Sequence, residues 1–203
     1  MQKTPHHFKR KEVKDIINKV LKDEKITLKP LSISTKESLD NDLTTTSFCF
    51  IEQIKDEENR IAIEDQPGKG FIDGLFTGLH DYYEERYKSL KDIKLFDLKV
   101  NPILSGSKTS IGTDAQAAVL FCLYVKNHGA AEFQHRSRSM IYSSYVLALE
   151  AFQFYINCEK AFHKIKMIIK DAESRNRSDI SSKYIYDLTK ITEVNNYEER
   201  QEG

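Results

Sequence analysis

The sequence lacks most features that mark secreted, membrane or nucleic-acid-binding proteins. It has 203 residues, with 31 basic residues against 31 acidic ones. Balanced charge gives no overall attraction to nucleic acid. No apolar run reaches the roughly 18–20 residues that a membrane-spanning helix needs, and the N-terminus has no signal-peptide core. We therefore expect a cytoplasmic globular protein that binds neither membranes nor nucleic acid.

The cysteines are too few and too widely spaced for a disulfide framework. Cys49, Cys122 and Cys158 each lie inside an apolar stretch. Small apolar surroundings of this kind favour a buried thiol in a reducing compartment over a disulfide or a reactive site. We expect three buried, free cysteines.

Recognisable catalytic patterns are also missing. The six histidines form no H-x-H, no H-E-x-x-H and no zinc pattern with cysteine, and there is no G-x-S-x-G nucleophile elbow. The sequence therefore predicts no catalytic residues, no metal site and no cofactor. An unrecognised enzyme that uses His135 or Cys122 is the third and last alternative for function.

The N-terminal part of the chain is predicted to stand apart from the main domain. Residues 9–23 have apolar side chains at helical spacing, which indicates an amphipathic helix; they are Val13, Ile16, Ile17, Val20 and Leu21. The polar stretch 29–42, with Pro30 and several serines and threonines, is interpreted as a linker. We assign residues 1–43 to an N-terminal helix and linker.

From residue 44 onward, strand patterns and helix patterns alternate twice. The predicted strands are 44–53, 60–66, 94–104, 116–126 and 130–137, and the predicted helices are 71–87 and 139–172. The helix starts near Phe71 and Ile141 lie 70 residues apart. This order predicts an α+β fold of two strand–strand–(strand)–helix units in a layered domain, residues 44–172, with the helices on one side of the sheets.

Four further details of these elements are predicted. In strand 94–104 the alternation predicts Phe96, Leu98 and Val100 on one face. Strand 116–126 is apolar on both faces, as expected of a central strand. Helix 139–172 is longer than a domain of this size can cover, so its far end is expected to pack against a partner chain or the N-terminal helix. Residues 173–203 are interpreted as a polar tail.

The segment QPGKGFIDG, residues 66–74, is the most informative for function. Glycines just before a helix let the backbone approach a ligand closely, and the N–H groups of the first turn can receive an anion. A plain turn is the commoner meaning of such a pattern. Gly74 and Gly78, one turn apart, indicate close packing of the helix backbone against a neighbour.

The second helix start has a similar character. Residues 135–139, HRSRS, offer a hydroxyl that can cap the helix and two guanidinium groups. A capped helix that begins with exposed arginines is favoured here over an anion site.

Four segments together resemble a known module. GKGFIDGLFTGL, KLFDLKVNPIL, GTDAQAAV and SRSMIYSSYVLAL occur in the order seen in the C-terminal allosteric, or dimerisation, domain of 2-isopropylmalate synthases, which citramalate and homocitrate synthases share. The resemblance covers roughly residues 44–157. It is most specific at Gly68-x-Gly70-x-Ile72-Asp73 and at residues 114–117. Phe71 stands where that family has proline.

The resemblance implies a dimer of β-β-β-α units that binds an end-product amino acid as feedback inhibitor, usually leucine in isopropylmalate synthases and isoleucine in citramalate synthases. Carried over by position, it implies an effector site made of Gly68, Gly70, Ile72, Asp73, Leu95, Leu98, Pro102, Ala115 and Ile141. Helix-start N–H groups would hold the carboxylate, and Asp73 or backbone carbonyls the ammonium. An apolar lining would hold the branched side chain.

The same resemblance limits the activity expected of this chain. The catalytic barrel of these synthases, with its metal-binding histidines, is missing from the sequence, so condensation of acetyl-CoA with a 2-oxo acid is not expected here. We expect a regulatory module of leucine biosynthesis that forms a homodimer and acts on a barrel partner. The alternative is a structural dimerisation module that binds no ligand.

Overall fold

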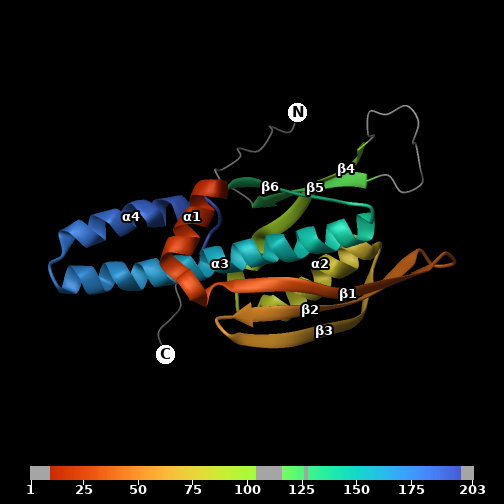
Figure 1. Cartoon of the computed structure of the whole chain (residues 1–203), viewed down its shortest axis with the longest axis horizontal. Coiled ribbons are helices and arrows are strands. Elements are labelled where there is room, and N and C mark those ends of the chain that lie inside the picture. Colours follow the sequence, from red (N-terminus) through yellow and green to blue (C-terminus); the bar gives the residue numbers. More distant parts are fainter. Residues whose placement is uncertain (1–9, 104–115, 126–127, 198–203) are drawn as a thin grey trace.

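The computed structural model describes residues 10–103, 116–125 and 128–197, which form an α+β fold (Figure 1). The helices are α1 (Arg10–Leu21), α2 (Phe71–Tyr83), α3 (Met140–Ser174) and α4 (Ser178–Thr192), with 3₁₀ turns at Lys22–Glu24 and Lys88–Asp92. The strands are β1 (Ile26–Ser38), β2 (Leu43–Ile54), β3 (Glu57–Gly68), β4 (Ile93–Ile103), β5 (Gln116–Val125) and β6 (Gly129–Ser137).

The strands form two antiparallel sheets of the same design. Their orders are β1-β2-β3 and β4-β5-β6, and each sheet is followed in the chain by a helix, α2 or α3. The β-β-β-α unit therefore occurs twice, and the predicted duplication and fold class are confirmed. The apolar strand β5 is the central strand of its sheet, as predicted.

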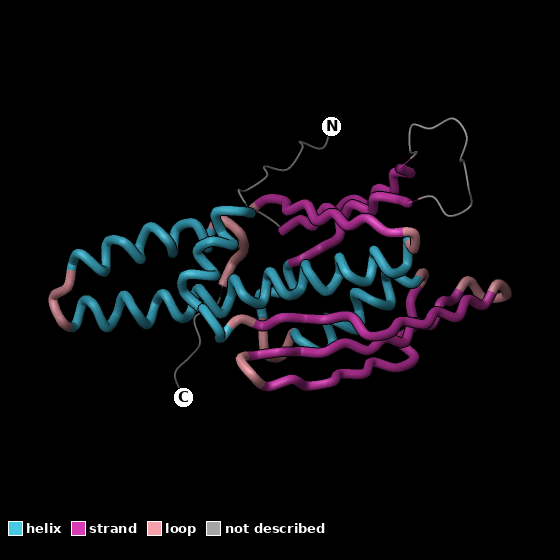
Figure 2. Tube along the Cα trace, viewed as in Figure 1, coloured by secondary structure: helices cyan, strands magenta, loops and turns pink. Residues whose placement is uncertain are grey.

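The helices α2 and α3 lie in a layer between the two sheets (Figures 1 and 2). Helix α2 packs on β2 and β3, while α3 packs on β1, β5 and β6. Each sheet therefore turns one face to the helices and the other to solvent. The apolar side chains between the layers form the core, for example Phe50, Leu79, Phe121 and Phe152, all at most 1% exposed.

The segment expected as a linker is mostly strand, and that part of the prediction was wrong. Residues 26–38 form β1, the edge strand beside β2. Its apolar residues Ile26, Leu28 and Ile33 lie opposite residues of β2, but a β-bulge between Pro30 and Ser32 breaks the alternation. An edge strand also tolerates proline, which has no N–H to contribute. Because of the bulge and the proline, residues 26–38 lack the regular alternation that predicts a strand.

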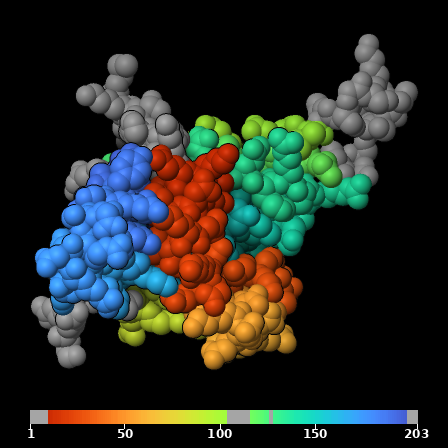
Figure 3. Space-filling view, turned by 60° about the vertical axis from the view of Figure 1, so that its left-hand side comes forward, coloured from red at the N-terminus to blue at the C-terminus, as the bar shows by residue number. Residues whose placement is uncertain are grey.

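The N-terminal helix packs on the main body of the molecule. All five apolar residues predicted for it are buried in α1. Helix α1 contacts α3 and α4, and Figure 3 shows it lying across the surface beside α4.

The segment expected as a polar tail is also structured over most of its length. Helix α4 packs along α3, and Ile191, Val194 and Tyr197 are buried. Serines and lysines interrupt the apolar residues of α4, so the sequence pattern did not indicate a helix there. The prediction of a polar tail was therefore wrong. The far end of the 35-residue helix α3 is thus covered by α4 and α1.

Candidate functional site

The glycine loop, residues 68–70 between β3 and α2, is tightly packed at Gly68 and open at Gly70. A Cβ atom on Gly68 would lie 2.5 Å from the backbone nitrogen of Gly74, too close for any side chain. A Cβ on Gly70 would meet nothing within 4 Å, and the backbone there is extended, with φ −175°. Gly68 is therefore required by packing, whereas Gly70 leaves space in front of the helix.

The glycines inside α2 serve the packing that their spacing predicted. A Cβ on Gly74 would lie 3.1 Å from the carbonyl oxygen of Gln66, and one on Gly78 would lie 3.0 Å from side-chain atoms of Phe48 and Ile63. Helix α2 thus approaches the first sheet closely because these two positions have no side chain.

The first turn of α2 has no side-chain cap. The N-cap residue is Gly70, which has no side chain to accept a hydrogen bond from the helix. The exposed carboxylate of Asp73 instead accepts a hydrogen bond of 3.0 Å from the Lys69 backbone N–H. The loop therefore places first-turn N–H groups, which attract anions, next to a carboxylate, which attracts cations.

A β-bulge in β4 sets which side chains face this region. Leu95 lies opposite Leu123 and Leu98 opposite Phe121, with a register shift between Leu95 and Asp97. Because Leu123 and Phe121 are two residues apart, they share a face, and so do Leu95 and Leu98. A regular strand would place residues three apart on opposite faces, so the bulge is what brings these two leucines together.

The same bulge corrects the predicted face of Phe96. Leu98 and Val100 share a face, as expected, but the ring of Phe96 packs on Tyr124 with centroids 6.2 Å apart. Tyr124 lies on the opposite face of β5 from Phe121. Phe96 therefore points to the outer face, and the prediction that it joins Leu98 and Val100 was wrong.

Two side chains of α2 reach the second sheet. The imidazole of His80, near the end of α2, lies close to the backbone of Ile93 at the start of β4. Phe76, one turn earlier, has its ring 5.9 Å from that of Phe121, the residue opposite Leu98. The start of α2, with Ile72, therefore lies toward the C-terminal half of β4. Pro102 is exposed further along the strand.

The start of α3 lies at the same end of the molecule as the start of α2 (Figure 1). The hydroxyl of Ser139 accepts a hydrogen bond of 3.1 Å from the Tyr142 N–H, so α3 is a capped helix, as favoured from the sequence. Ile141 in its first turn is 37% exposed and Leu98 is 42% exposed. The apolar part of the predicted site is thus an open surface.

Not every predicted site residue can be placed. Ala115, with Asp114, lies outside the described residues. Of the others, Gly70, Ile72 and Asp73 lie together at the start of α2, while Leu98 lies in the middle of β4 and Leu95 is half-buried.

Two buried hydroxyl groups near the helix starts were not anticipated from the sequence. Thr46 Oγ1 and Ser144 Oγ are buried without a hydrogen-bond partner among the described residues. Thr46 Oγ1 lies 3.1 Å from where a Cβ on Gly74 would be. The sequence does not indicate that the Thr46 hydroxyl is buried, because its burial depends on the helix that packs over β2.

The described residues offer little catalytic geometry. His135 Nδ1 lies 3.0 Å from Ser143 Oγ, but Ser143 is fully buried, so no substrate can reach its hydroxyl. No group of three or more His, Cys, Asp or Glu side chains comes together there as a metal site. The three cysteines are buried and free, as predicted. None of the described helices has the length and apolar character needed to span a membrane.

Comparison with known proteins adds no assignment. No family model matches this chain, and no curated protein matches it either.

Proposed function

We propose that this chain is a regulatory and dimerisation module of the 2-isopropylmalate synthase type, which binds a branched-chain amino acid, with leucine first among the candidates, as feedback effector of leucine biosynthesis in the cytoplasm. The observation that carries the proposal is the uncapped start of α2, where Gly70 leaves space and the Asp73 carboxylate lies in the first turn.

The chemistry of this end suits a zwitterion with an apolar side chain. The first-turn N–H groups of α2 receive the carboxylate, at the positive end of the helix dipole. The Asp73 carboxylate, which accepts one hydrogen bond from Lys69, has capacity left for an ammonium group. Ile72 and Leu98 then contact the branched side chain.

The architecture also supports the proposal. The resemblance implies two β-β-β-α units, and the chain contains that unit twice. The third strand of the first unit, β1, is formed by residues 26–38, outside the range 44–157 over which the motifs match. Its presence is therefore support that is independent of those motifs.

The exposed apolar residues at this end fit a homodimer. Leu98, Val100, Met140, Ile141 and Tyr142 are between 37% and 47% exposed. A second copy that covers them would also close the effector site. A catalytic barrel on a partner chain would carry the acetyl-CoA condensation, and effector binding would bias it by about 1–3 kcal/mol, as in other allosteric pairs.

The same exposed surface favours a second candidate function. A module that only dimerises needs an apolar face but no ligand. In that case the glycine loop serves packing alone, as Gly68 already does.

Calorimetric titration of the purified chain with leucine, isoleucine and valine, run beside sedimentation analysis, separates the two. We expect saturable binding of one of these amino acids, with D-leucine as the control that has the same atoms in the wrong arrangement. A stable dimer that binds none of them would refute the sensor role and leave the assembly role.

A further inference from the structure

The tip of the β1–β2 hairpin, residues 38–43, extends beyond the rest of the first sheet (Figures 1 and 2). Strand β3 pairs with β2 only as far as Thr44, which lies opposite Gly68. Residues 38–43 therefore have no third strand beside them. Because Gly68 belongs to the glycine loop, the tip projects from the end of the molecule at which α2 begins.

The hairpin tip carries exposed leucines among acidic residues. Leu39 is 91% exposed, more than any other large apolar residue that the structure describes, and Leu43 is 43% exposed. The acidic residues beside them are Glu37, Asp40 and Asp42, which outnumber Lys36. A single exposed leucine is ordinary on a protein surface. A projecting tip that combines leucines with carboxylates is instead suited to a surface that is apolar and basic.

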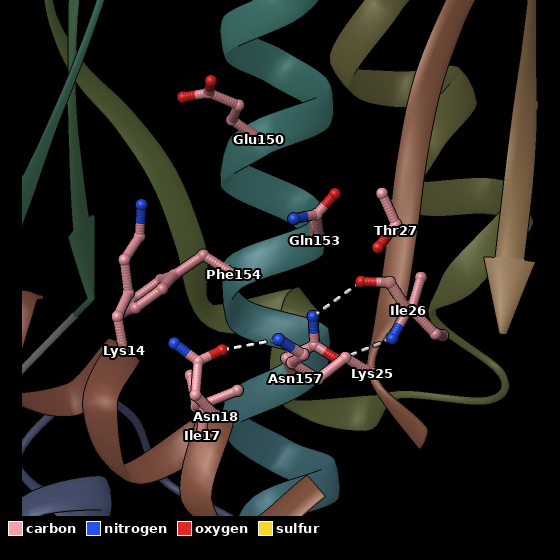
Figure 4. A pocket seen from close by; sticks show the side chains of 10 residues that line it. All are labelled: Lys14, Ile17, Asn18, Lys25, Ile26, Thr27, Glu150, Gln153, Phe154 and Asn157. Carbon is pink, nitrogen blue, oxygen red and sulfur yellow. Dashed lines mark hydrogen bonds between the residues drawn. The ribbon is translucent and has the colours of Figure 1, made fainter. Parts of the chain in front are cut away.

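The other end of the hairpin is fixed to α3. The Asn157 side chain pairs with both backbone groups of Ile26, at 2.8 and 2.9 Å (Figure 4). The Leu28 backbone N–H donates a further hydrogen bond of 2.7 Å to Gln153 Oε1. From there β1 and β2 are paired up to Ser38. An arm that is anchored and paired in this way loses little conformational entropy when its tip docks.

A surface of complementary character lies at the start of α3, at the same end of the molecule (Figure 1). The first turn of α3 exposes three apolar side chains in a row, Met140, Ile141 and Tyr142, which are 37–47% exposed. Two exposed arginines, Arg136 and Arg138, come shortly before this turn in the chain. The start of α3 thus offers apolar contact area next to guanidinium groups, which bind carboxylates well.

The hairpin tip and the start of α3 do not meet within one chain. Leu39 is almost fully exposed, so its side chain is not packed on α3 or on the second sheet of its own molecule. The tip belongs to the first sheet, whereas Arg136 lies on β6 of the second sheet, and the helix layer separates the two sheets. A second copy of the chain offers the same start of α3 without this separation.

We propose that the hairpin tip of one copy docks on the start of α3 of a second copy. Leu39 packs against the exposed apolar side chains of that turn, and the carboxylates of the tip approach Arg136 and Arg138. A two-fold axis makes the contact twice, so each copy contributes one tip and one α3 start. The inference rests on the homodimer of the proposed function, but it does not require an amino-acid effector.

The first test is the dimer dissociation constant of the full chain, measured by sedimentation equilibrium. Leu39→Ser should raise this constant by at least about 10-fold, because it removes an apolar contact from both halves of a symmetric interface. Leu39 is exposed, so the variant should fold, which circular dichroism checks. Ile185→Ser, at a 48% exposed position of α4, is the matched control. An unchanged constant in Leu39→Ser would overturn the proposal.

A disulfide between two copies locates the contact. Oxidation of the double variant Leu39→Cys, Met140→Cys should join two chains, and mass spectrometry should find residues 39 and 140 in one linked peptide pair. Leu39→Cys combined with Ile185→Cys is the control and should give no link between residues 39 and 185. The three native cysteines are buried and should not take part. A dimer without the 39–140 link would place the interface elsewhere and reject the contact.

These results can be told apart from those on the amino-acid site. A dimer that binds leucine but does not respond to Leu39→Ser would leave the sensor role and reject the hairpin contact. A dimer that is weakened by Leu39→Ser but binds no amino acid would support the hairpin contact and refute the sensor role. A wild-type chain that stays monomeric would reject the hairpin contact together with the homodimer.

Discussion

The side chain of Asn157 on α3 pairs with both backbone groups of Ile26 on β1, as a neighbouring strand would. The hydrogen bonds are 2.9 Å from the Ile26 N–H and 2.8 Å to its carbonyl, and both residues are buried. An edge strand normally presents such groups to solvent or to another chain. Here a helix side chain satisfies them, so the first sheet is joined to α3 by a specific polar contact.

Replacing Asn157 by leucine should therefore cost much more than a typical polar substitution. It leaves one buried N–H and one buried carbonyl without partners, at about 1–3 kcal/mol each. We expect the free energy of unfolding, measured in urea, to fall by about 2–5 kcal/mol. Gln134→Leu, at an exposed position on β6, is the control and should change the free energy of unfolding little. A similar loss in both variants would show that the Asn157–Ile26 contact does not stabilise the fold beyond an ordinary surface residue.

The two loop glycines should respond in opposite ways to a larger side chain. Gly68→Ala puts a Cβ 2.5 Å from a backbone nitrogen and should lower the free energy of unfolding by about 1–3 kcal/mol. Gly70→Val meets open space, so it should leave stability within about 0.5 kcal/mol while it blocks the proposed amino-acid site.

Calorimetry on Gly70→Val completes that comparison. Leucine binding by this variant with unchanged affinity would remove the glycine loop from the site, even if the wild-type chain binds leucine.

The tail residues that form α4 should contribute to global stability. Ile191 is fully buried, so Ile191→Ala should cost about 2–4 kcal/mol through lost burial and a cavity. Ile185 on the same helix is 48% exposed, and Ile185→Ala should change stability by less than about 0.5 kcal/mol. Equal, small effects in urea denaturation would mean that α4 does not stay docked on α3 in solution.

His80 should make stability depend on pH in the weakly acidic range. Burial lowers the pKa of its imidazole, against the opposing charges of Glu84 and Asp81. The unfolded chain, with a His pKa of about 6.5, then binds more protons than the folded one. The free energy of unfolding should therefore fall as the pH drops from about 6.5 through the lowered folded pKa.

His80→Gln removes this contribution, so its curve of stability against pH should be flatter between pH 5 and 7. Urea titrations at several pH values measure both curves, and parallel curves would exclude His80 as their source.

The thiols should react slowly in the folded protein. Burial raises the pKa of Cys158, which is fully buried, and also that of Cys122, where nearby Glu132 and Asp97 add to the effect. Both changes reduce the fraction of thiolate, which is the reactive form. A thiol reagent should label these two cysteines at a rate limited by opening of the structure, and all three at once in denaturant. Rapid labelling of native Cys122 would contradict its place on the central strand.

The sequence predicted those parts of the fold that have regular periodicity. The apolar stripe of α1 is buried at each predicted residue, and the two helix starts at Phe71 and Met140 lie within one residue of the expected positions. What it did not predict depends on long-range contacts. Strand β1 is interrupted by a bulge after Pro30. The apolar residues of α4 are buried only because the helix packs on α3.

The candidate site shows the same division. The sequence placed Gly68 and Gly70 before a helix and Asp73 in its first turn, and the structure has them there. The sequence does not predict that the backbone of Gly74 fills the space beside Gly68. It also does not predict that a bulge after Leu95 places Leu95 and Leu98 on one face of β4. Both depend on where another backbone lies, which local pattern does not encode.

Helix α3 gives the molecule a mechanical asymmetry. It has 35 residues, which corresponds to a length of about 52 Å, and it begins at the same end of the molecule as α2 and ends at the turn into α4. A tilt of about 5° around its first turn would move the other end by about 4–5 Å over that length. A rearrangement of that size at the first turn would therefore become a displacement of side-chain size at the tip of the α3–α4 hairpin.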